Sequence, residues 1–388
     1  MKNLNQQKVS NFVNSLYCST GAYKFSPHSE EYNSLSTCFA LLTFEVLGET
    51  PFNLKVSLDY LQDFQDKDSG LFIDTTILDK LKGTHNIEYI NHQVTYHILM
   101  VFDAFGISSK FDLNFLEEYK SEVYLNKWLE SLNWKNPWLI SNNVMFILNF
   151  LIHQNEVENK KYIDYILDWL DENQSNENGM WNLGHKSTLH NQMAGAFHFQ
   201  YFFDYFKRKK NNTNLIVDNT LLIQDYDGLF SYASGGGSCD DLDGIDLLCR
   251  NYHDVDEYRK DKIIKALMKA KASLLVNQNN DGGFCWAKRT KFNFKNVIHM
   301  IPIRLILAKE NLDAKRSFIM KVKNIIATIF FKKKLKWQFS GIDKCSIMID
   351  ESDIFSTWFR LLSISMIDKV INNEPLKIRS KIGIGYLK

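Results

Sequence analysis

One short pattern recurs along the chain and restricts its fold more than any other feature. An amphipathic stretch ends in glutamine, and a short polar link, a glycine and an aromatic residue follow within a few positions. A pattern repeated at a regular interval is typical of folds built from equivalent supersecondary units, so each copy predicts one unit. The four clear copies have their glutamines at Gln65, Gln174, Gln224 and Gln278.

The spacing of the copies predicts the size and number of the units. Adjacent clear copies lie 50–54 residues apart from Gln174 onward, and the interval from Gln65 to Gln174 is about two such periods. A degraded copy around Trp134 fits the middle of that interval, and another lies around Gln338. The chain is therefore expected to contain about six units of 50–60 residues, each with room for two helices.

The segments between the turns have apolar residues three and four positions apart, which indicates helices. No sustained alternation of apolar and polar residues occurs, so few strands are expected. The first and last units are as apolar as the middle ones, which favours a closed ring over an open solenoid with polar ends. Helical segments are expected within 35–47, 94–105, 144–152, 193–206, 263–276, 297–307 and 356–367.

Charge and cysteine content narrow the classes of function. Lysine and arginine number 46 against 45 acidic residues, and no long basic block occurs, which argues against a nucleic-acid partner. The six cysteines are scattered without a C-x-x-C pair. The N-terminus is polar, and no apolar run approaches the ~18 residues of a membrane helix. We expect a soluble, cytoplasmic protein whose partner is a small molecule.

The run from Gln278 to Trp286, Gln-x-x-Asp-Gly-Gly-Phe-x-Trp, resembles the QW-type repeat of terpene cyclases and protein prenyltransferase β subunits. The resemblance covers roughly residues 30–370. It implies an all-α (α/α)6 toroid of about six helical hairpins, with inner helices ringed by outer ones around a central funnel. We expect a single toroid domain over 31–370, a helical lead-in over 1–30 and a C-terminal tail over 371–388.

An acidic stretch follows three glycines at 235–237 and contains Asp240, Asp241 and Asp243 directly before an apolar run. Acidic residues at such a point indicate a helix start, where the helix dipole favours negative charge. Class II terpene cyclases carry Asp-x-Asp-Asp at a comparable place, and Asp241-Leu242-Asp243-Gly244 is similar except for the last residue. The resemblance implies that Asp243 protonates an isoprenoid and starts its cyclisation, with Asp241 helping to keep the proton on Asp243.

Zinc is disfavoured because two of its usual ligands are missing. In prenyltransferase β subunits an Asp-Gly-Cys and a later Asp-x-x-His-Thr bind zinc. The similar places here read Asp243-Gly-Ile and Asp353-Ile-Phe-Ser-Thr, without the cysteine and the histidine. Cys239 is a weak substitute for the thiolate. We expect no cofactor, although the three carboxylates leave open whether Mg²⁺ binds.

Two other hypotheses remain open at this point. A toroid enzyme could act on a saccharide or another polar substrate, with Asp243 and His190 as the acid–base pair. Alternatively, the chain could be a non-catalytic binding ring in which the acidic cluster only caps a helix. An aromatic, mostly apolar cavity would favour the cyclase, and a polar cavity would favour the saccharide enzyme.

Several further residues are candidates for substrate binding. His190 and Asn191 stand at an apparent helix start, and Asn142 precedes an apolar helix. Arg360, like Arg304, lies in an apolar helix and requires an anion, either an internal carboxylate or a charged group of the substrate. The substrate-binding candidates are Cys239, Asp240, Asn142, Asn191, Trp358 and Arg360.

Overall fold

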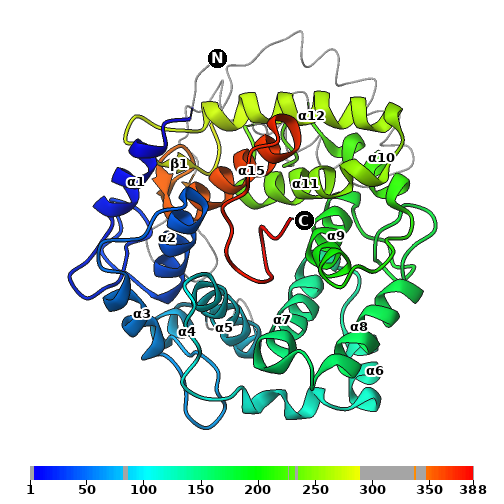
Figure 1. Cartoon of the computed structure of the whole chain (residues 1–388), viewed down its shortest axis with the longest axis horizontal. Helices are drawn as coiled ribbons and strands as arrows, with labels where there is room; N and C mark the ends of the chain where they lie inside the picture. Colours follow the sequence, from blue (N-terminus) through cyan, green and yellow to red (C-terminus); the bar gives the residue numbers. More distant parts are fainter. Residues whose placement is uncertain are drawn as a thin grey trace.

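The computed structural model describes residues 4–81, 86–225, 227–231, 235–288, 336–337 and 347–387, and this part of the chain is almost entirely helical. Figure 1 shows the helices arranged as two concentric rings. The inner ring consists of α2 (Ser34–Leu47), α5 (Ile87–Ala104), α7 (Pro137–Asn155), α9 (Leu189–Tyr205), α11 (Ser238–Asn251) and α15 (Ile354–Asn372).

The inner ring is closed. Each of these helices packs against the next one in the sequence, and α15 packs against both α11 and α2, which joins the end of the chain to its beginning. The prediction of an (α/α)6 toroid is thereby confirmed. Outside the inner ring lie α1 (Gln6–Ser15), α3 (Leu54–Gln62), α4 (Thr75–Leu81), α6 (Glu122–Ser131), α8 (Lys160–Glu172), α10 (Thr213–Ile223) and α12 (Glu257–Val276).

Burial separates the two kinds of helix. Every residue of α2 is buried, because this helix has neighbours on all sides. The outer helix α8 buries one stripe, which includes Ile163, Ile166 and Leu170, and its opposite face is polar. A helix that is apolar on one side belongs at the surface, and one that is apolar all round belongs in the interior.

The repeated turns have the structure that their sequence predicts. In each clear copy the glutamine side-chain amide donates a hydrogen bond to the carbonyl of the glycine, over 2.7–3.1 Å. The four glycines have positive φ, between 77° and 98°, where a side chain would be strained. Each glycine lies inside the turn, several residues beyond the end of its helix. The glycines are Gly70, Gly179, Gly228 and Gly282.

Three inner helices begin at least one turn earlier than their apolar spacing predicts. Helix α5 starts at Ile87, α7 at Pro137 and α9 at Leu189. The segment 297–307 and the turn around Gln338 lie outside the described residues. No helix in the described ranges is both long and apolar enough to span a bilayer.

Strands are few, as expected. Two short antiparallel pairs occur in the described residues, β1 (Phe284–Cys285) with β4 (Ser352–Asp353), and β2 (Lys336–Trp337) with β3 (Ile347–Met348). The first pair joins the last clear turn of the repeat to the start of α15. Two further helices of 3₁₀ type, η1 (Asn114–Tyr119) and η2 (Tyr252–Asp254), complete the described structure.

Candidate active site

A cavity of about 350 Å³ lies at the centre of the ring. Its size falls at the lower end of the range for small-molecule sites, about 300–1,000 Å³. Helices α5, α7, α9, α11 and α15 line it, together with one residue of the C-terminal segment. Its walls are largely aromatic, with the rings of Tyr89, Trp138, Phe197, Phe355 and Phe359.

The exposure of the lining residues shows which end of the cavity is open. Asn136, Trp138 and Asn142, in and just before the first turns of α7, are half-buried. His97 and His198, further along their helices, are each only 5% exposed. The cavity therefore opens near the N-terminal ends of the inner helices and closes toward their middle.

Asp243 is the one carboxylic acid among the described residues that line this cavity. It is the sixth residue of α11 and is 2% exposed. Its Oδ2 has no hydrogen-bond partner in the described part of the chain. Burial raises the pKa of the Asp243 carboxyl well above its ordinary value, and the negative charges of Asp240, Asp246 and Asp241 raise this pKa further. Both effects favour the protonated form of this carboxyl group.

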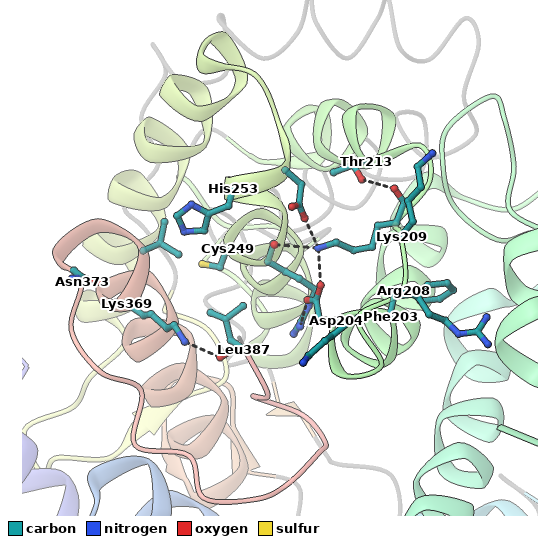
Figure 2. A pocket seen from close by; sticks show the side chains of 15 residues that line it. Phe203, Asp204, Arg208, Lys209, Thr213, Cys249, His253, Lys369, Asn373 and Leu387 are labelled. Atoms are coloured by element: carbon teal, nitrogen blue, oxygen red, sulfur yellow. Dashed lines mark hydrogen bonds and ion pairs between the residues drawn. The ribbon is translucent and has the colours of Figure 1, made fainter. Parts of the chain in front are cut away.

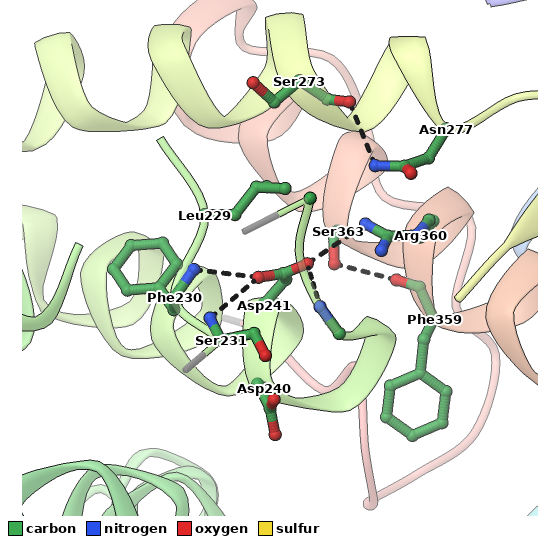
Figure 3. Close-up of polar contacts among 12 residues, drawn as sticks. Leu229, Phe230, Ser231, Asp240, Asp241, Ser273, Asn277, Phe359, Arg360 and Ser363 are labelled. Carbon is green, nitrogen blue, oxygen red and sulfur yellow. Dashed lines mark hydrogen bonds and ion pairs between the residues drawn. The ribbon is translucent and has the colours of Figure 1, made fainter. Parts of the chain in front are cut away.

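Asp241 has a different environment, shown in Figure 3. Its carboxylate accepts hydrogen bonds from the backbone N–H groups of Phe230, Ser231 and Gly237, at 2.8, 3.3 and 3.1 Å. It also pairs with the guanidinium of Arg360 at 3.1 Å, and both side chains are fully buried. Burial raises the pKa of Asp241 to about 6 although Arg360 lowers it. Asp241 binds the glycine loop to α11 and does not line the cavity.

Hydrogen bonds equivalent to the one from the Phe230 N–H to Asp241 occur at two other places around the ring. The fourth residues of α2 and α15 are Thr37 and Thr357, and their hydroxyls accept the backbone N–H groups of Tyr23 and Phe284. Asp241 is the fourth residue of α11 and accepts the N–H of Phe230 in the same way. It therefore performs a structural role that the fold repeats.

The two carboxyl groups face different sides of one helix. Residues two apart on an α-helix point about 200° apart, so Asp241 and Asp243 cannot share a face. The packing around Gly244 leaves no room for the third carboxylate of the Asp-x-Asp-Asp motif. A Cβ at this position would lie 2.4 Å from the ring of Phe230, which already fills the space.

The structure places Arg360 and Trp358 outside the cavity lining. The Arg360 guanidinium donates to the carbonyl of Cys285 at 2.8 Å and to that of Trp286, in addition to its pairing with Asp241. Of the two anions considered for Arg360, the structure supplies the internal carboxylate. Trp358 stacks on Phe39, with their centroids 5.5 Å apart, and is 1% exposed.

His190 and Asp240 lie together behind the cavity wall. The Nε2 of His190 is 3.9 Å from Oδ2 of Asp240, and its ring contacts the edge of Trp138 with the centroids 6.2 Å apart. Neither residue is among those that line the cavity. Asn191 is also outside the lining, and its backbone N–H is capped by the hydroxyl of Thr188. His190 is thus close to the carboxyl group of Asp240 and does not line the cavity with Asp243.

Asn142 and Cys239 line the cavity beside Asp243. Burial raises the pKa of the Cys239 thiol well above its ordinary value, and the charges of Asp240 and Asp243 raise it further, so this group is a poor thiolate ligand. In the described residues, no group of three histidine, cysteine or acidic side chains is arranged to hold a metal. Asp353, at the second place considered for zinc, caps α15 by accepting the N–H of Ser356.

Several lining residues were not selected as site residues from the sequence. Burial lowers the pKa of His97 to about 4 and that of His198 to about 3, so both are neutral at pH 7. Nδ1 of His97 donates to the carbonyl of Gln93 at 2.7 Å, which leaves Nε2 as the basic nitrogen. In the sequence, a histidine within an apolar helix cannot be distinguished from a packed core residue. The spacing of Phe355 and Phe359, one helical turn apart, could have indicated an inward face.

No family model and no curated protein matches this chain. Among solved structures, a variant of the type II terpene cyclase MstE from Scytonema, in complex with geranylgeranyl dihydroxybenzoate, is 12% identical with a TM-score of 0.48, and the match covers 94% of this chain and 99% of that one. The apo form of MstE is 11% identical with a TM-score of 0.48, and the match covers 94% and 97%. Likeness at this level carries no argument by itself. The evidence for the fold is the ring of helices described above, which makes the chain a closed α/α toroid.

Proposed function

We propose that the chain is an enzyme resembling a class II terpene cyclase, in which Asp243 protonates an isoprenoid in the central cavity. One observation carries this proposal: a buried carboxyl group, whose surroundings favour the protonated form, lies in a cavity with several aromatic rings in its walls. Transfer of a proton to an alkene requires an acid that keeps its proton at neutral pH until the substrate is bound. The burial of Asp243 and the negative charges near it raise its pKa, which supports this role.

The proposed reaction balances without a cofactor. The O–H bond of Asp243 breaks as a new C–H bond forms at the less substituted carbon of an alkene, which leaves a carboxylate and a tertiary carbocation. A second alkene of the same substrate attacks this cation and closes a ring. Loss of a proton from the cyclised cation gives the neutral product, and the Asp243 carboxylate takes up a proton again from water.

The walls of the cavity suit a cationic intermediate. The faces of aromatic rings attract positive charge, and tryptophan attracts it most strongly. Trp138, Phe355 and Phe359 contribute such rings. Exclusion of water by these side chains would also protect the cation from premature capture.

The saccharide hypothesis has less support. Glycoside hydrolysis ordinarily uses two carboxyl groups that flank one bond. Asp243 is the single carboxyl group among the described lining residues, and His190 lies behind Trp138. The described lining thus offers no second carboxyl group for this chemistry, although His97 and His198 are present.

Deuterium incorporation tests the proposal directly. The protein is incubated in D₂O with farnesol, geranylgeraniol and their diphosphates, and products are analysed by mass spectrometry. A cyclised product should carry one deuterium from the acid, and Asp243→Asn should reduce its rate by about 10²–10⁴-fold. Asp243→Glu, which keeps a carboxyl group, is the matched control and should retain more activity than Asp243→Asn. Equal rates for wild type and Asp243→Asn would contradict the proposal, and binding without turnover in both would indicate a binding ring.

A further inference from the structure

We propose that the C-terminal segment 373–387 forms the closed end of the cavity, and that Ile384 limits the length of the chain that the cavity accepts. This inference rests on the proposed function, because it concerns the same cavity. Figure 1 shows the segment running from the end of α15 back into the ring. Ile384 is the residue of this segment that lines the cavity.

A buried carboxylate anchors the start of this segment. Glu45, near the end of α2, is 1% exposed. It accepts hydrogen bonds from the backbone N–H groups of Arg379 and Ser380, at 2.7 and 2.8 Å, and from the Ser380 hydroxyl at 2.8 Å. Three donors on one buried carboxylate hold the segment at a defined position, since loss of any of them would leave buried charge incompletely satisfied.

The backbone around Ile384 is fitted closely to two inner helices. The N–H of Ile384 donates to the hydroxyl of Tyr96 at 3.1 Å. Gly383 and Gly385 flank it with φ of 144° and 98°. A Cβ on either glycine would come within 3.0 Å of a side chain, Met100 on α5 or Leu362 on α15. These glycines therefore allow the close approach that places Ile384 against the cavity.

The end of the segment is held by cations. Arg250 donates to the carbonyl of Tyr386 and Lys369 donates to that of Leu387, each at 2.7 Å. These contacts lie at a second, basic cavity of about 610 Å³ beside the C-terminal ends of α9, α11 and α15, shown in Figure 2. Arg250 is itself buried and paired with Asp246 at 2.6 Å.

These anchors place Ile384 at the deep end of the cavity. The other lining residues on α7, α11 and α15 come from the N-terminal halves of these helices, and those on α5 reach His97, just past the middle of that helix. The anchors of the segment lie toward the opposite ends, at Glu45 on α2, Arg250 on α11 and Lys369 on α15. The Ile384 side chain therefore closes the cavity opposite its opening, and its size sets the available depth.

Binding of prenyl alcohols of increasing length tests this inference. Asp243→Asn serves as the background, so that turnover does not disturb the measurement. Dissociation constants for geraniol, farnesol and geranylgeraniol are measured by quenching of tryptophan fluorescence. Ile384→Ala should raise the affinity for geranylgeraniol relative to geraniol by about tenfold, because a deeper cavity buries roughly two more methylene groups. Ile384→Phe should shift the preference toward geraniol.

Ile382→Ala is the matched control. Ile382 is fully buried in the same segment but does not line the cavity, so this variant should leave the ratio of affinities within about twofold. An unchanged ratio in folded Ile384→Ala, or an equal change in Ile382→Ala, would overturn the inference. If no prenyl alcohol binds any variant, the isoprenoid function is wrong. The crystal structure of Ile384→Ala then decides, because a cavity that extends past residue 384 supports the inference and an unchanged cavity contradicts it.

Discussion

Asp241 and Asp243 are two residues apart on one helix and have opposite surroundings. Asp241 accepts three backbone N–H groups and pairs with Arg360. Asp243 lines the cavity with one oxygen that no described residue bonds. A buried carboxyl group without hydrogen-bond partners costs free energy of folding, so Asp243 does not stabilise the fold as Asp241 does. The architecture explains Asp241, whereas we assign Asp243 to the proposed reaction.

This difference also refines the expected role of Asp241. The resemblance implied that Asp241 helps to keep the proton on Asp243, and the charge of Asp241 does raise the pKa of Asp243, after burial and the charges of Asp240 and Asp246. The Asp241 side chain itself is directed to the glycine loop. Asp240 acts on Asp243 electrostatically and does not line the cavity.

The largest expected effect comes from removing the carboxylate of Asp241, whose hydrogen bonds are satisfied. Asp241→Ala leaves the buried Arg360 without its carboxylate and leaves three N–H groups without their acceptor. Such a change should lower the free energy of unfolding by about 3–5 kcal/mol. Urea denaturation followed by circular dichroism measures it.

A double variant provides the control. Asp241→Thr restores the hydroxyl that Thr37 and Thr357 supply at equivalent positions, and Arg360→Met removes the buried charge. The combination should recover at least half of the lost stability. A loss below about 1 kcal/mol in Asp241→Ala alone would show that the ion pair is not structural.

The next effect is a pH dependence that belongs to Asp243. Its pKa is raised on folding, so the folded protein keeps the proton while the unfolded chain releases it above its ordinary pKa of about 3.9. Ionisation then favours the unfolded state, and stability falls as pH rises from about 4 toward the folded pKa. The slope approaches about 1.4 kcal/mol per pH unit.

Asp243→Asn removes this slope and serves as the reference. The pKa of Asp241, raised to about 6, adds a pH dependence of the same sign to both proteins, so it largely cancels in their difference. The free energy of unfolding is measured in urea at several pH values between about 4 and 7. A difference between the two proteins that does not vary with pH would show that Asp243 is ionised in the folded state.

The smallest expected effect concerns Gly244, beside the acid. Gly244→Ala places a Cβ 2.4 Å from the Phe230 ring, so the ring must move. Overpacking costs about 1–3 kcal/mol, and the better helix propensity of alanine returns about 1 kcal/mol. The net loss should be about 1 kcal/mol in thermal or urea unfolding, and Phe230→Leu in the same chain should reduce it. A stabilised Gly244→Ala would mean that the Phe230 ring does not exclude the third carboxylate of the motif.

Much of the fold could be predicted because it depends on residues that are close together in the sequence. The glutamine of each turn bonds a glycine four or five residues away, and positive φ selects glycine there. Helical periodicity located most inner helices, although it missed the first turns of α5, α7 and α9. Asp243 could be selected because an acidic cluster before an apolar run is visible in the sequence.

The remaining features depend on contacts between residues far apart in the chain. Arg360 pairs with Asp241, which is 119 positions away in the sequence, and Glu45 accepts a hydrogen bond from Ser380, which is 335 positions away. No local spacing in the sequence indicates either pair. For the same reason the sequence could not show that Ile384 lines the cavity or that His190 lies behind Trp138. The sequence alone determined that the chain forms repeated helical hairpins and carries an acidic helix start. Only closure of the ring decided which carboxyl group meets the cavity, because closure brings α15 and the C-terminal segment against helices from the first half of the chain.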